Sequence, residues 1–468
     1  MIPLSETLRR AVGITPSPRQ LAWQQLEFYA FIHYGPNTYT DQEWGDGTAD
    51  PALFNPDCLD PDQWVQAARS AGMRGLILTC KHHDGFCLWP TRQTDYSVAS
   101  SPWQNGQGDV VRMTADACRR AGLKFGVYLS PWDRHEPSYG SGEAYDRFYI
   151  AQLTELLTQY GEIFCVWLDG ACGEGPNGRV QRYNWDAYYR TVRQLQPNAV
   201  ISVTGPDVRW CGNEAGHCRE SEWSVVPAAL SDPALIAAHS QQVDDGTFSR
   251  RVTRQDEDLG SRAVLEAAST PLIWYPAEVN TSIRPGWFYH TREDDKVRTP
   301  EELFSIYMNS VGGNAGFLLN LPPMPNGRLN DRDVASLEGL GRLLEERLGH
   351  PLAAALTADS EAPGHAAPCA EADAEGFWKP EEDKEAPALT LHFARPVQVG
   401  YVSLREDLMS GQRIEAGEIL ADGKPAAAFT VVGARRLCRV DARCTELTVR
   451  ILQSRGTPTL REFTAFEG

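Results

Sequence analysis

The sequence predicts an α/β fold: a (β/α)8-type barrel over residues 1–351, followed by an all-β sandwich over residues 352–468. In the first part, near-continuous apolar runs alternate with amphipathic helical stretches. In the second part, short runs of alternating apolar and polar residues replace that pattern. A chain of 468 residues, of which 42% are hydrophobic, is also long enough for two to three domains.

The alternation in the first part predicts strands at 26–34, 73–80, 124–129, 163–168, 199–203 and 316–321. The predicted helices cover 61–71, 110–121, 143–160, 185–195, 300–311 and 332–348, with Asp60 as N-cap of the first. Continuous apolar strands are typical of a parallel sheet covered by helices, and about eight such units suit a closed barrel. A doubly wound open sheet is the alternative, although no G-x-G-x-x-G motif follows the first strand to indicate a dinucleotide site.

The second part begins with a stretch at 353–388 that is rich in Ala, Pro and Glu. The runs LTLHF, VGYVSL, QRIEAGEIL, AAFTVV and ELTVRIL follow and read as short strands at the spacing of a sandwich. This part contains no constellation of acids, histidines and thiols that would carry chemistry alone. We therefore expect the chemistry to lie in the first part.

The charge of the chain limits the partners that it would bind. A formal net charge of −18 and a pI of about 5.1 argue against nucleic acid or an anionic membrane surface. A neutral or cationic small substrate fits better. No apolar run approaches the length of about 18 residues that a membrane span needs. The sequence leaves the oligomeric state open.

Eleven cysteines occur, at positions 58, 80, 87, 118, 165, 172, 211, 218, 369, 438 and 444. An odd number without a C-x-x-C pair favours free buried thiols in a reducing compartment over a disulfide framework. The N-terminal segment MIPLSETLRRAVGITPSPRQ has no apolar core long enough for a signal peptide. We therefore expect a cytoplasmic protein; a secreted form whose leader has been removed is the alternative.

The segment EIFCVWLDG at 162–170 carries the strongest catalytic signal. It reads as a buried apolar strand that ends in Asp169. Burying an unpaired carboxylate is costly, whereas the C-terminal ends of barrel strands are where catalytic groups are placed. The alternative is that Asp169 only caps the Asp-Gly turn that follows.

Other polar and aromatic residues follow the remaining strands. His33 lies at the end of the first strand, whereas His82 and His83 follow the second, Trp132 the third, and Trp210 and Glu214 the fifth. In a barrel these strand ends surround one mouth. A sugar suits such a mouth, because its hydroxyl groups need hydrogen-bond partners and its apolar face packs on aromatic rings.

The histidines also have other interpretations. His82, His83 and Asp84 could form a metal cluster. However, adjacent strand residues point to opposite faces, and the usual His-x-His or His-x-x-x-His spacing is absent. We therefore predict no metal site. His33, which lies on an apolar strand, could be a core histidine that hydrogen-bonds to backbone.

Some aromatic and acidic residues could likewise be structural. Four tryptophans could each be packed in the core: Trp44, Trp89, Trp167 and Trp287. Glu43 could be a solvated loop acid. Glu220 and Glu222 could pair with Arg219 at the surface, where such pairs contribute little.

The segments FIHYGPNTYT, KHHDGFCLWPTRQTDYSV, GVYLSPWDRH, VWLDGA and RWCGNEAGHCRESEWSV together resemble the retaining α-L-fucosidases of glycoside hydrolase family 29. The match runs in order through essentially the whole first part, and KHHDGF followed by a strand-end aspartate is specific. RWCGNEAG and SIRPGWFYH are similar to the subgroup that acts on α-1,3- and α-1,4-linked fucose. That subgroup commonly carries a galactose-binding-like β-sandwich, which EGFWKP, LREDLMSGQRIEAGEIL and RILQSRGTPTLREF resemble. AEADAEGFW departs from the calcium loop of such sandwiches, which argues against calcium there.

The resemblance implies an exo-acting enzyme that hydrolyses terminal α-1,3- and α-1,4-linked L-fucose of branched glycans. It implies Asp169 as the nucleophile and Glu214 as the general acid/base. The fucose-binding residues would be His33, Glu43, Trp44, His82, His83, Tyr128 and Trp167, with Trp287 near the C6 methyl group. Fucosylated oligosaccharides or glycoconjugates are then the expected partners, and no cofactor is implied. A retaining enzyme needs two carboxyl groups about 5–5.5 Å apart.

Two interpretations from other classes remain. The first is a glycan-binding barrel without turnover, against which the presence of both Asp169 and Glu214 counts. The second is a barrel hydrolase with another sugar specificity, such as an α-L-galactosidase, because an apolar pocket rejects an added hydroxyl group only weakly.

Overall fold

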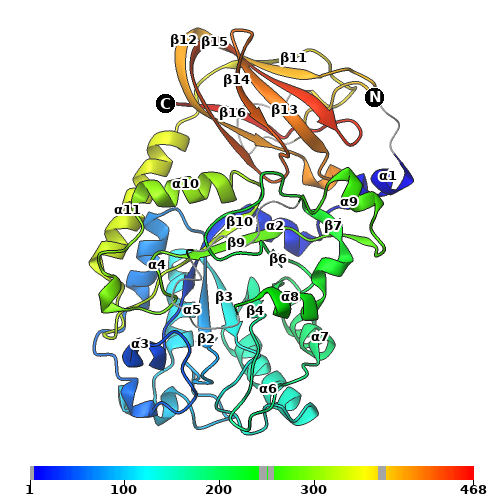
Figure 1. Cartoon of the computed structure of the whole chain (residues 1–468). Helices are drawn as coiled ribbons and strands as arrows, with labels where there is room; N and C mark the ends of the chain where they lie inside the picture. The colour runs from blue at the N-terminus through cyan, green and yellow to red at the C-terminus, as the bar shows by residue number, and fades with distance from the viewer. Residues whose placement is uncertain (1–4, 242–249, 251–257, 367–375) are drawn as a thin grey trace.

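The structure, a computed structural model, describes residues 5–241, 250, 258–366 and 376–468. Figure 1 shows a barrel surrounded by helices and, above it, a β-domain formed by the C-terminal part of the chain. No helix among the described residues is long and apolar enough to cross a membrane. The described cysteines are all unpaired, and Cys369 lies outside the described residues.

Parallel strands form the barrel. Within the described residues they are β1 (Phe28–Ile32), β2 (Gly75–Lys81), β3 (Lys124–Leu129), β4 (Cys165–Leu168), β5 (Val200–Val203), β6 (Arg209–Trp210), β9 (Ala277–Ser282) and β10 (Gly316–Asn320). Their order in the sheet is β5-β4-β3-β2-β1-β10-β9-β6. A parallel bridge between Ser202 and Val208 joins the two ends of this order, so the sheet nearly closes on itself. The predicted barrel is confirmed.

The helices that cover the barrel follow the predicted alternation. They are α4 (Pro61–Ser70), α5 (Val110–Ala121), α6 (Glu143–Gln159), α7 (Trp185–Leu195), α10 (Pro300–Ser310) and α11 (Asp331–Leu348). The predicted N-cap of α4 is confirmed, because the Asp60 side chain accepts from the backbone N–H of Gln63. Thr299 and Glu302 form a capping box before α10, whose first residue is Pro300.

One part of the barrel departs from the strand–helix alternation. Residues 204–208, all of them described, link β5 directly to β6 without a helix. Val203 at the end of β5 has φ of 67°, a conformation that is rare for a β-branched residue. Instead, α2 (Pro18–Leu26), which precedes the first strand, packs against β5 and β10. Of the smaller helices, α1 (Glu6–Val12) precedes α2 and α3 (Pro36–Thr40) follows β1.

The connection from β6 to β9 is long and was not predicted as structured. It contains an antiparallel pair, β7 (Val225–Pro227) and β8 (Leu272–Trp274), and two short helices, α8 (Pro233–His239) and α9 (Arg262–Glu266). Each of these elements is too short to show a periodic pattern in the sequence.

The β-domain consists of antiparallel strands. They are β11 (Ala355–Ala358), β12 (Ala388–Arg405), β13 (Ile414–Ala421), β14 (Lys424–Phe429), β15 (Arg436–Ser454) and β16 (Glu462–Glu467). One half of the long pair β12 and β15 carries β11, β13 and β14; the other half carries β16. These strands enclose an apolar core of their own that includes Trp378, Leu391, Val402 and Phe463. The predicted all-β domain is confirmed.

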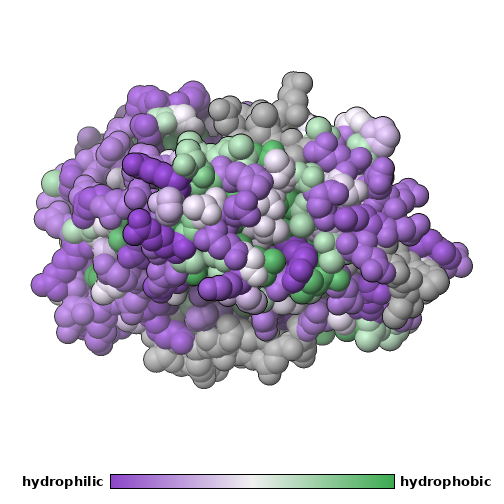
Figure 2. All heavy atoms as spheres, turned by 90° about the horizontal axis from the view of Figure 1, so that it is seen from above, coloured by the Kyte–Doolittle hydropathy of each residue, from purple (hydrophilic) through white to green (hydrophobic). Residues whose placement is uncertain are grey.

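The connection between the two domains runs from the end of α11 to β11, and the boundary predicted between residues 351 and 352 lies in it. The segment AEADAEGFW, considered above for calcium, lies largely outside the described residues. Figure 2, which looks down on the molecule from the side of the β-domain, shows mostly hydrophilic residues with apolar ones between them.

Candidate active site

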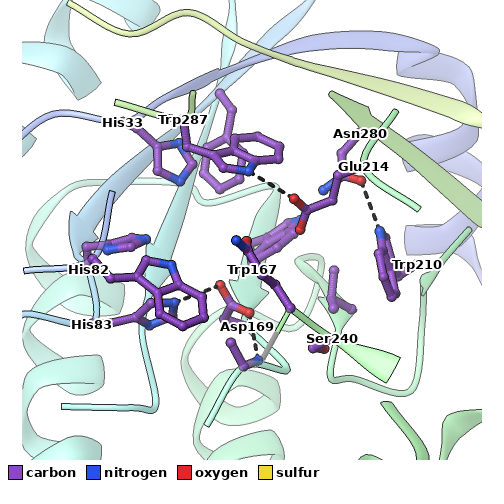
Figure 3. A pocket seen from close by; sticks show the side chains of 15 residues that line it. His33, His82, His83, Trp167, Asp169, Trp210, Glu214, Ser240, Asn280 and Trp287 are labelled. Carbon is purple, nitrogen blue, oxygen red and sulfur yellow. Dashed lines mark hydrogen bonds and ion pairs between the residues drawn. The ribbon is translucent and has the colours of Figure 1, made fainter. Parts of the chain in front are cut away.

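A pocket of about 530 Å³ opens where the barrel strands end at their carboxyl termini (Figure 3). Its lining comes from Phe31, His33, Trp44, His82, His83, Trp167, Asp169, Ala171, Val203, Trp210, Glu214, Ser240, Gln241, Asn280 and Trp287. This is the position that barrel enzymes use for catalysis, because the loops after the strands converge there. Of the ten site residues that the sequence predicted, eight line this pocket, and Glu43 and Tyr128 lie behind its wall.

Asp169 follows directly on the last residue of β4. One carboxylate oxygen, Oδ1, accepts from the backbone N–H of Ala171 at 2.8 Å, and Oδ2 accepts from the Tyr128 hydroxyl at 2.8 Å. Its side chain is 19% exposed and opens into the pocket. Burial raises the pKa of this carboxyl, and the two hydrogen bonds oppose that rise. Asp169 therefore both caps the turn and presents a carboxylate to the pocket.

Glu214 reaches the same pocket from the loop between β6 and β7, so the two carboxyl groups come from separate elements (Figure 3). Its Oε2 accepts from the indole Nε1 of Trp287 at 2.9 Å. Around it, the Asn213 side chain accepts from the backbone N–H of Ala215 at 3.1 Å and donates to the carbonyl of His217 at 2.9 Å. The Asn213 side chain thus connects residues on both sides of Glu214 within the loop tip.

His33 is held as a neutral ring. Burial lowers its pKa to about 3. Asn320 donates its amide N–H groups to Ser282 Oγ and to the Trp287 carbonyl, so its amide oxygen is the atom 2.8 Å from His33 Nδ1. Nδ1 must then carry the proton, and Nε2 is left as an acceptor for a substrate hydroxyl.

His83 is oriented in a similar way. Ser130 donates its hydroxyl to the Trp132 carbonyl at 2.6 Å and therefore accepts from His83 Nδ1 at 2.8 Å. Burial lowers the pKa of His83 to about 3, and its Nε2 lies 3.7 Å from Asp169 Oδ2. Burial also lowers the pKa of His82, whose Nδ1 has no hydrogen-bond partner among the described residues.

Hydrogen bonds and ring contacts with neighbouring side chains hold the aromatic rings of the pocket in place. Trp167 donates Nε1 to Glu278 Oε1 at 2.7 Å, and its ring stacks on Tyr128 with centroids 5.3 Å apart. The ring centroids of Trp287 and His33 lie 5.2 Å apart, and those of Trp44 and His83 lie 5.6 Å apart. Rigid aromatic faces of this kind suit the apolar face of a sugar.

Trp89, by contrast, is a core residue. It is 1% exposed, and its Nε1 donates to Glu155 Oε2 at 2.8 Å. The structural interpretation of this tryptophan is confirmed, whereas Trp44, Trp167 and Trp287 all face the pocket.

The interpretation of Glu43 as a solvated loop acid is wrong. Its side chain is buried and accepts from the backbone N–H groups of Trp287 at 2.8 Å and Phe288 at 3.1 Å. A third contact joins its Oε1 to Nε2 of His290 at 2.7 Å. Glu43 therefore holds the loop that carries Trp287.

The interpretation of Glu222 as half of a weak surface pair is also wrong. Glu222 is 1% exposed and lies between the guanidinium groups of Arg209 and Arg219, which are buried as well. Only Glu220 of this group is exposed. Glu222 is not among the described residues that line the pocket, and the two arginines neutralise its charge.

Sequence reasoning did not assign Asn280, Ser240, Gln241 or Glu278 to the site. Asn280 lies on β9, whose sequence AEVNTS is too polar to read as a buried strand, and donors around it include Trp210 Nε1 at 3.0 Å. Glu278 on the same strand accepts from Trp167, and burial raises its pKa to about 7. The sequence did hold one sign of this part of the site, a glutamate and an asparagine two residues apart, because two such residues lie on the same face of a strand.

The described residues hold no group of three or more His, Cys, Asp or Glu side chains that could bind a metal ion. Asp84, which the sequence places beside the two histidines, is buried, and burial together with the charge of Asp133 raises its pKa to about 7.

A barrel pocket with two carboxyl groups, neutral histidines and aromatic walls is that of a glycoside hydrolase. The α-L-fucosidase family model matches residues 17–347. Alpha-L-fucosidase 1 of Arabidopsis thaliana is 40% identical over 452 residues, which cover 93% of this chain and 84% of that protein. The chain belongs to the α-L-fucosidase family, and its activity is that of an α-L-fucosidase.

Solved structures agree with this assignment. A glycoside hydrolase 29 family member from an unknown rumen bacterium aligns with a TM-score of 0.78 and 36% identity, over 97% of this chain and 77% of that one. A Ruminococcus gnavus GH29 fucosidase in complex with fucose aligns with a TM-score of 0.82 and 26% identity, over 97% of this chain and 95% of that one. The family assignment favours fucosidase activity over a binding-only barrel and over an α-L-galactosidase.

Proposed function

We propose that the protein is an exo-acting, retaining α-L-fucosidase that releases terminal α-1,3- and α-1,4-linked L-fucose from branched glycans. The observation that carries the proposal is that Asp169 and Glu214 open into one pocket from different elements, with different partners on each carboxyl group. Two such carboxyl groups are what a double displacement requires.

Asp169 would act as the nucleophile. It stands at the end of a rigid strand, and its two hydrogen bonds orient the carboxylate toward the pocket. The ionised carboxylate attacks the anomeric carbon and forms a fucosyl-enzyme. The bond from that carbon to the leaving-group oxygen breaks, and the general acid protonates this oxygen. Water then attacks the same carbon and regenerates the carboxylate.

Glu214 would act first as general acid and then as general base. Because Trp287 Nε1 donates to Oε2, the proton to be transferred resides on the other oxygen, Oε1. Glu214 gives this proton to the leaving sugar and later takes one from the attacking water. A loop position suits this role, since the group must reach an oxygen outside the fucose ring.

The fucose itself would be held by neutral acceptors and aromatic faces. Nε2 of His33 is an acceptor for a hydroxyl group, as derived above, and His82 and His83 flank the same space. Trp287 would face the C6 methyl group, and Trp44 and Trp167 would enclose the ring. Glu43 and Tyr128 would act through Trp287 and Asp169, whose positions they hold.

The linkage preference is supported by the resemblance of the loops around Glu214 and Trp287 to the α-1,3/4-specific subgroup. Trp210, Ser240 and Gln241 also line the pocket, and an aromatic face with hydroxyl and amide groups would suit a branching galactose. Binding energy from that galactose would be used in the transition state. A Lewis trisaccharide should therefore react much faster than 2'-fucosyllactose.

Two measurements test the proposal. Proton NMR of the reaction at early times should detect α-L-fucose as the first product, and β-L-fucose first would exclude retention. A comparison of kcat/KM on Lewis trisaccharides, 2'-fucosyllactose and a core-fucosylated oligosaccharide tests the linkage preference. Equal rates on the first two would reject it while leaving fucosidase activity intact.

A further inference from the structure

We infer that the β-domain holds the acid/base in place: Thr430, Arg436 and Gln412 are positioning residues for the loop that carries Glu214. This inference rests on the role proposed above for Glu214. The loop, residues 211–224 and hereafter the Glu214 loop, leaves the barrel after β6 and ends at β7, which pairs with β8 outside the barrel sheet.

The tip of the Glu214 loop is a closed unit. The Asn213 side chain bonds to residues on both sides of Glu214, as described above. Gly216 follows with φ of 86°, and a Cβ atom there would meet Ile306 Cγ2 of α10 at 3.0 Å. A side chain at this position would therefore be strained by the backbone conformation and tightly packed against Ile306. These contacts tie the residues of the tip to one another, so the position of Glu214 depends on how the rest of the loop is held as well as on its bond to Trp287.

Buried charges tie the two ends of the loop together on the barrel side. Arg219 donates Nη1 to the carbonyl of Cys211 at 2.8 Å, and its backbone N–H donates to Glu222 Oε2 at 3.2 Å. Glu222 also pairs with Arg209 of β6. All three charged side chains are nearly inaccessible to solvent.

The outer part of the loop is anchored on the β-domain. The carbonyl of Glu220 accepts from Thr430 Oγ1 at 2.6 Å and from Arg436 Nη2 at 3.2 Å. Arg436 is itself fixed, because its Nε donates to the carbonyl of Val431 at 2.6 Å. Thr430 directly follows β14, and Arg436 is the first residue of β15.

A second anchor lies two residues further along. Gln412 accepts from the backbone N–H of Ser224 at 2.8 Å and donates to the carbonyl of Glu222 at 3.4 Å. Asn314, in the loop before β10, also donates to that carbonyl at 2.7 Å and accepts from the N–H of Ala434 at 2.7 Å. The Glu214 loop is therefore clamped between the barrel and the β-domain.

The residues that hold the proposed nucleophile, Asp169, belong to the barrel and not to the β-domain. Asp169 is held by Tyr128 of β3 and by its own turn, all within the barrel. A displacement of about 1 Å of a catalytic group can cost a factor of about 100 in rate. Loosening the β-domain anchors should then impair proton donation to the leaving group while attack by Asp169 continues.

The experiment uses the full chain with the double variant Thr430→Val/Arg436→Met. We measure kcat/KM, which reports the steps up to departure of the leaving group, on a Lewis trisaccharide, on phenyl α-L-fucoside and on 2-chloro-4-nitrophenyl α-L-fucoside. The first two need a proton on the leaving oxygen, and their kcat/KM should fall about tenfold; the kcat/KM of the third should change by less than about twofold. Thr430→Ser, which keeps the hydroxyl donor, should retain the wild-type pattern.

Arg439→Met is the matched control. Arg439 lies on the same strand, β15, but is exposed, and its guanidinium group pairs with the exposed carboxylate of Asp441. It should leave all three rates unchanged. An equal loss on all three substrates in the double variant, or no loss in a folded one, would overturn the inference. Where circular dichroism shows that the double variant does not fold, Thr430→Val alone decides by the same comparison.

A separate result distinguishes this inference from the assignment of Glu214. If Glu214→Ala lacks the leaving-group dependence, Glu214 is not the acid/base and the proposed role fails. If Glu214→Ala shows that dependence and the anchor variants do not, only the role of the β-domain fails.

Discussion

The hydroxyl of Tyr128 on β3 donates to Oδ2 of Asp169 at the end of β4, across a distance of 2.8 Å. Burial raises the pKa of Asp169, and this hydrogen bond lowers it. In a Tyr128→Phe variant the pKa of Asp169 should therefore rise further. Because the proposed mechanism requires the ionised carboxylate to attack, the acid limb of the kcat/KM profile should move to higher pH.

A matched control is Tyr149→Phe, since the Tyr149 hydroxyl is equally buried but donates to the carbonyl of Leu129. It should leave the acid limb where it is. An unshifted limb in Tyr128→Phe would show that Asp169 is not the group whose ionisation limits the reaction. His33 and His83, with pKa values of about 3, should remain neutral across the working range.

Replacement of the proposed nucleophile, Asp169, should abolish turnover without affecting the fold. Asp169→Asn keeps the volume of the side chain and loses the attacking charge, so kcat should fall by about four to six orders of magnitude. The thermal unfolding midpoint should stay close to that of the wild type. Substantial activity in this folded variant, measured on an aryl fucoside, would assign the nucleophile elsewhere.

Glu214 and Glu222 should behave differently on replacement by alanine. Glu214→Ala should lose most activity on natural glycosides and much less on activated aryl fucosides, whose leaving group needs no proton. Added azide should rescue turnover by attacking the fucosyl-enzyme.

Glu222→Ala should show neither the leaving-group dependence nor the rescue. It leaves Arg209 and Arg219 buried without their counter-charge, and breaking such a pair costs about 3–5 kcal/mol of unfolding free energy. Chemical denaturation measures this loss. Azide rescue in Glu222→Ala, with Glu214→Ala still active, would reverse the two roles.

We expect Glu43 to affect substrate binding through the loop that it holds. In Glu43→Ala the backbone N–H groups of Trp287 and Phe288 lose their acceptor, so Trp287 should no longer pack in one position against the pocket. We expect KM for fucosides to rise about tenfold, equivalent to about 1.4 kcal/mol of binding.

Asp41→Asn is the control for Glu43→Ala. Asp41 contacts the same His290 from the exposed side and makes no contact with the Trp287 backbone. Its KM should change little. A rise in KM of the same size in both variants would assign the effect to His290 rather than to the backbone contacts of Glu43.

The junction of the two domains should be sensitive to acid. Burial opposes ionisation of Glu27, but the charges of Arg435 and Arg405 outweigh it and hold the pKa of that carboxyl below its ordinary value. A lowered folded-state pKa gives stability that is present above the unfolded-state pKa and is lost as the pH falls through the folded-state pKa. Wild-type unfolding free energy should thus drop more steeply below about pH 4.5 than that of Glu27→Gln.

Urea unfolding at pH 7 and at pH values below 4.5 checks this difference. At pH 7 Glu27→Gln should be less stable than the wild type, and the gap should narrow with acid. Glu143→Gln is the control, because Glu143 is an exposed carboxylate paired with Arg147 on α6. A pH dependence of Glu27→Gln that parallels the wild type would contradict the sign of the shift.

The sequence could predict the strands and helices that show a long pattern, and α5, β3 and α7 have the predicted bounds. It could not predict β6, which has two residues, or β9, whose polar residues are buried because they face a polar pocket and one another. It also could not show that the five residues after β5 replace a helix, because the left-handed turn at Val203 breaks the usual preference of that residue.

For the site, the signal was strongest where a polar residue ends an apolar strand, as at Asp169 and His33. It failed for Glu43 and Glu222. A carboxylate in a loop gives no sign in the sequence of whether its partners are water, backbone N–H groups or buried arginines, since those partners come from distant segments. Trp287, which Glu43 contacts, lies 244 residues further along the chain.

The pairing of β1 with β10 joins the first and last strands of the barrel, for example Tyr29 with Leu318. During synthesis, β1 emerges long before β10 and has only β2 beside it on one edge. Its other edge carries unpaired backbone groups until nearly 290 further residues have been made, and exposed strand edges promote association between chains. The slow, aggregation-prone phase of folding should therefore end only when β10 inserts, and chains truncated before it should accumulate in the insoluble fraction.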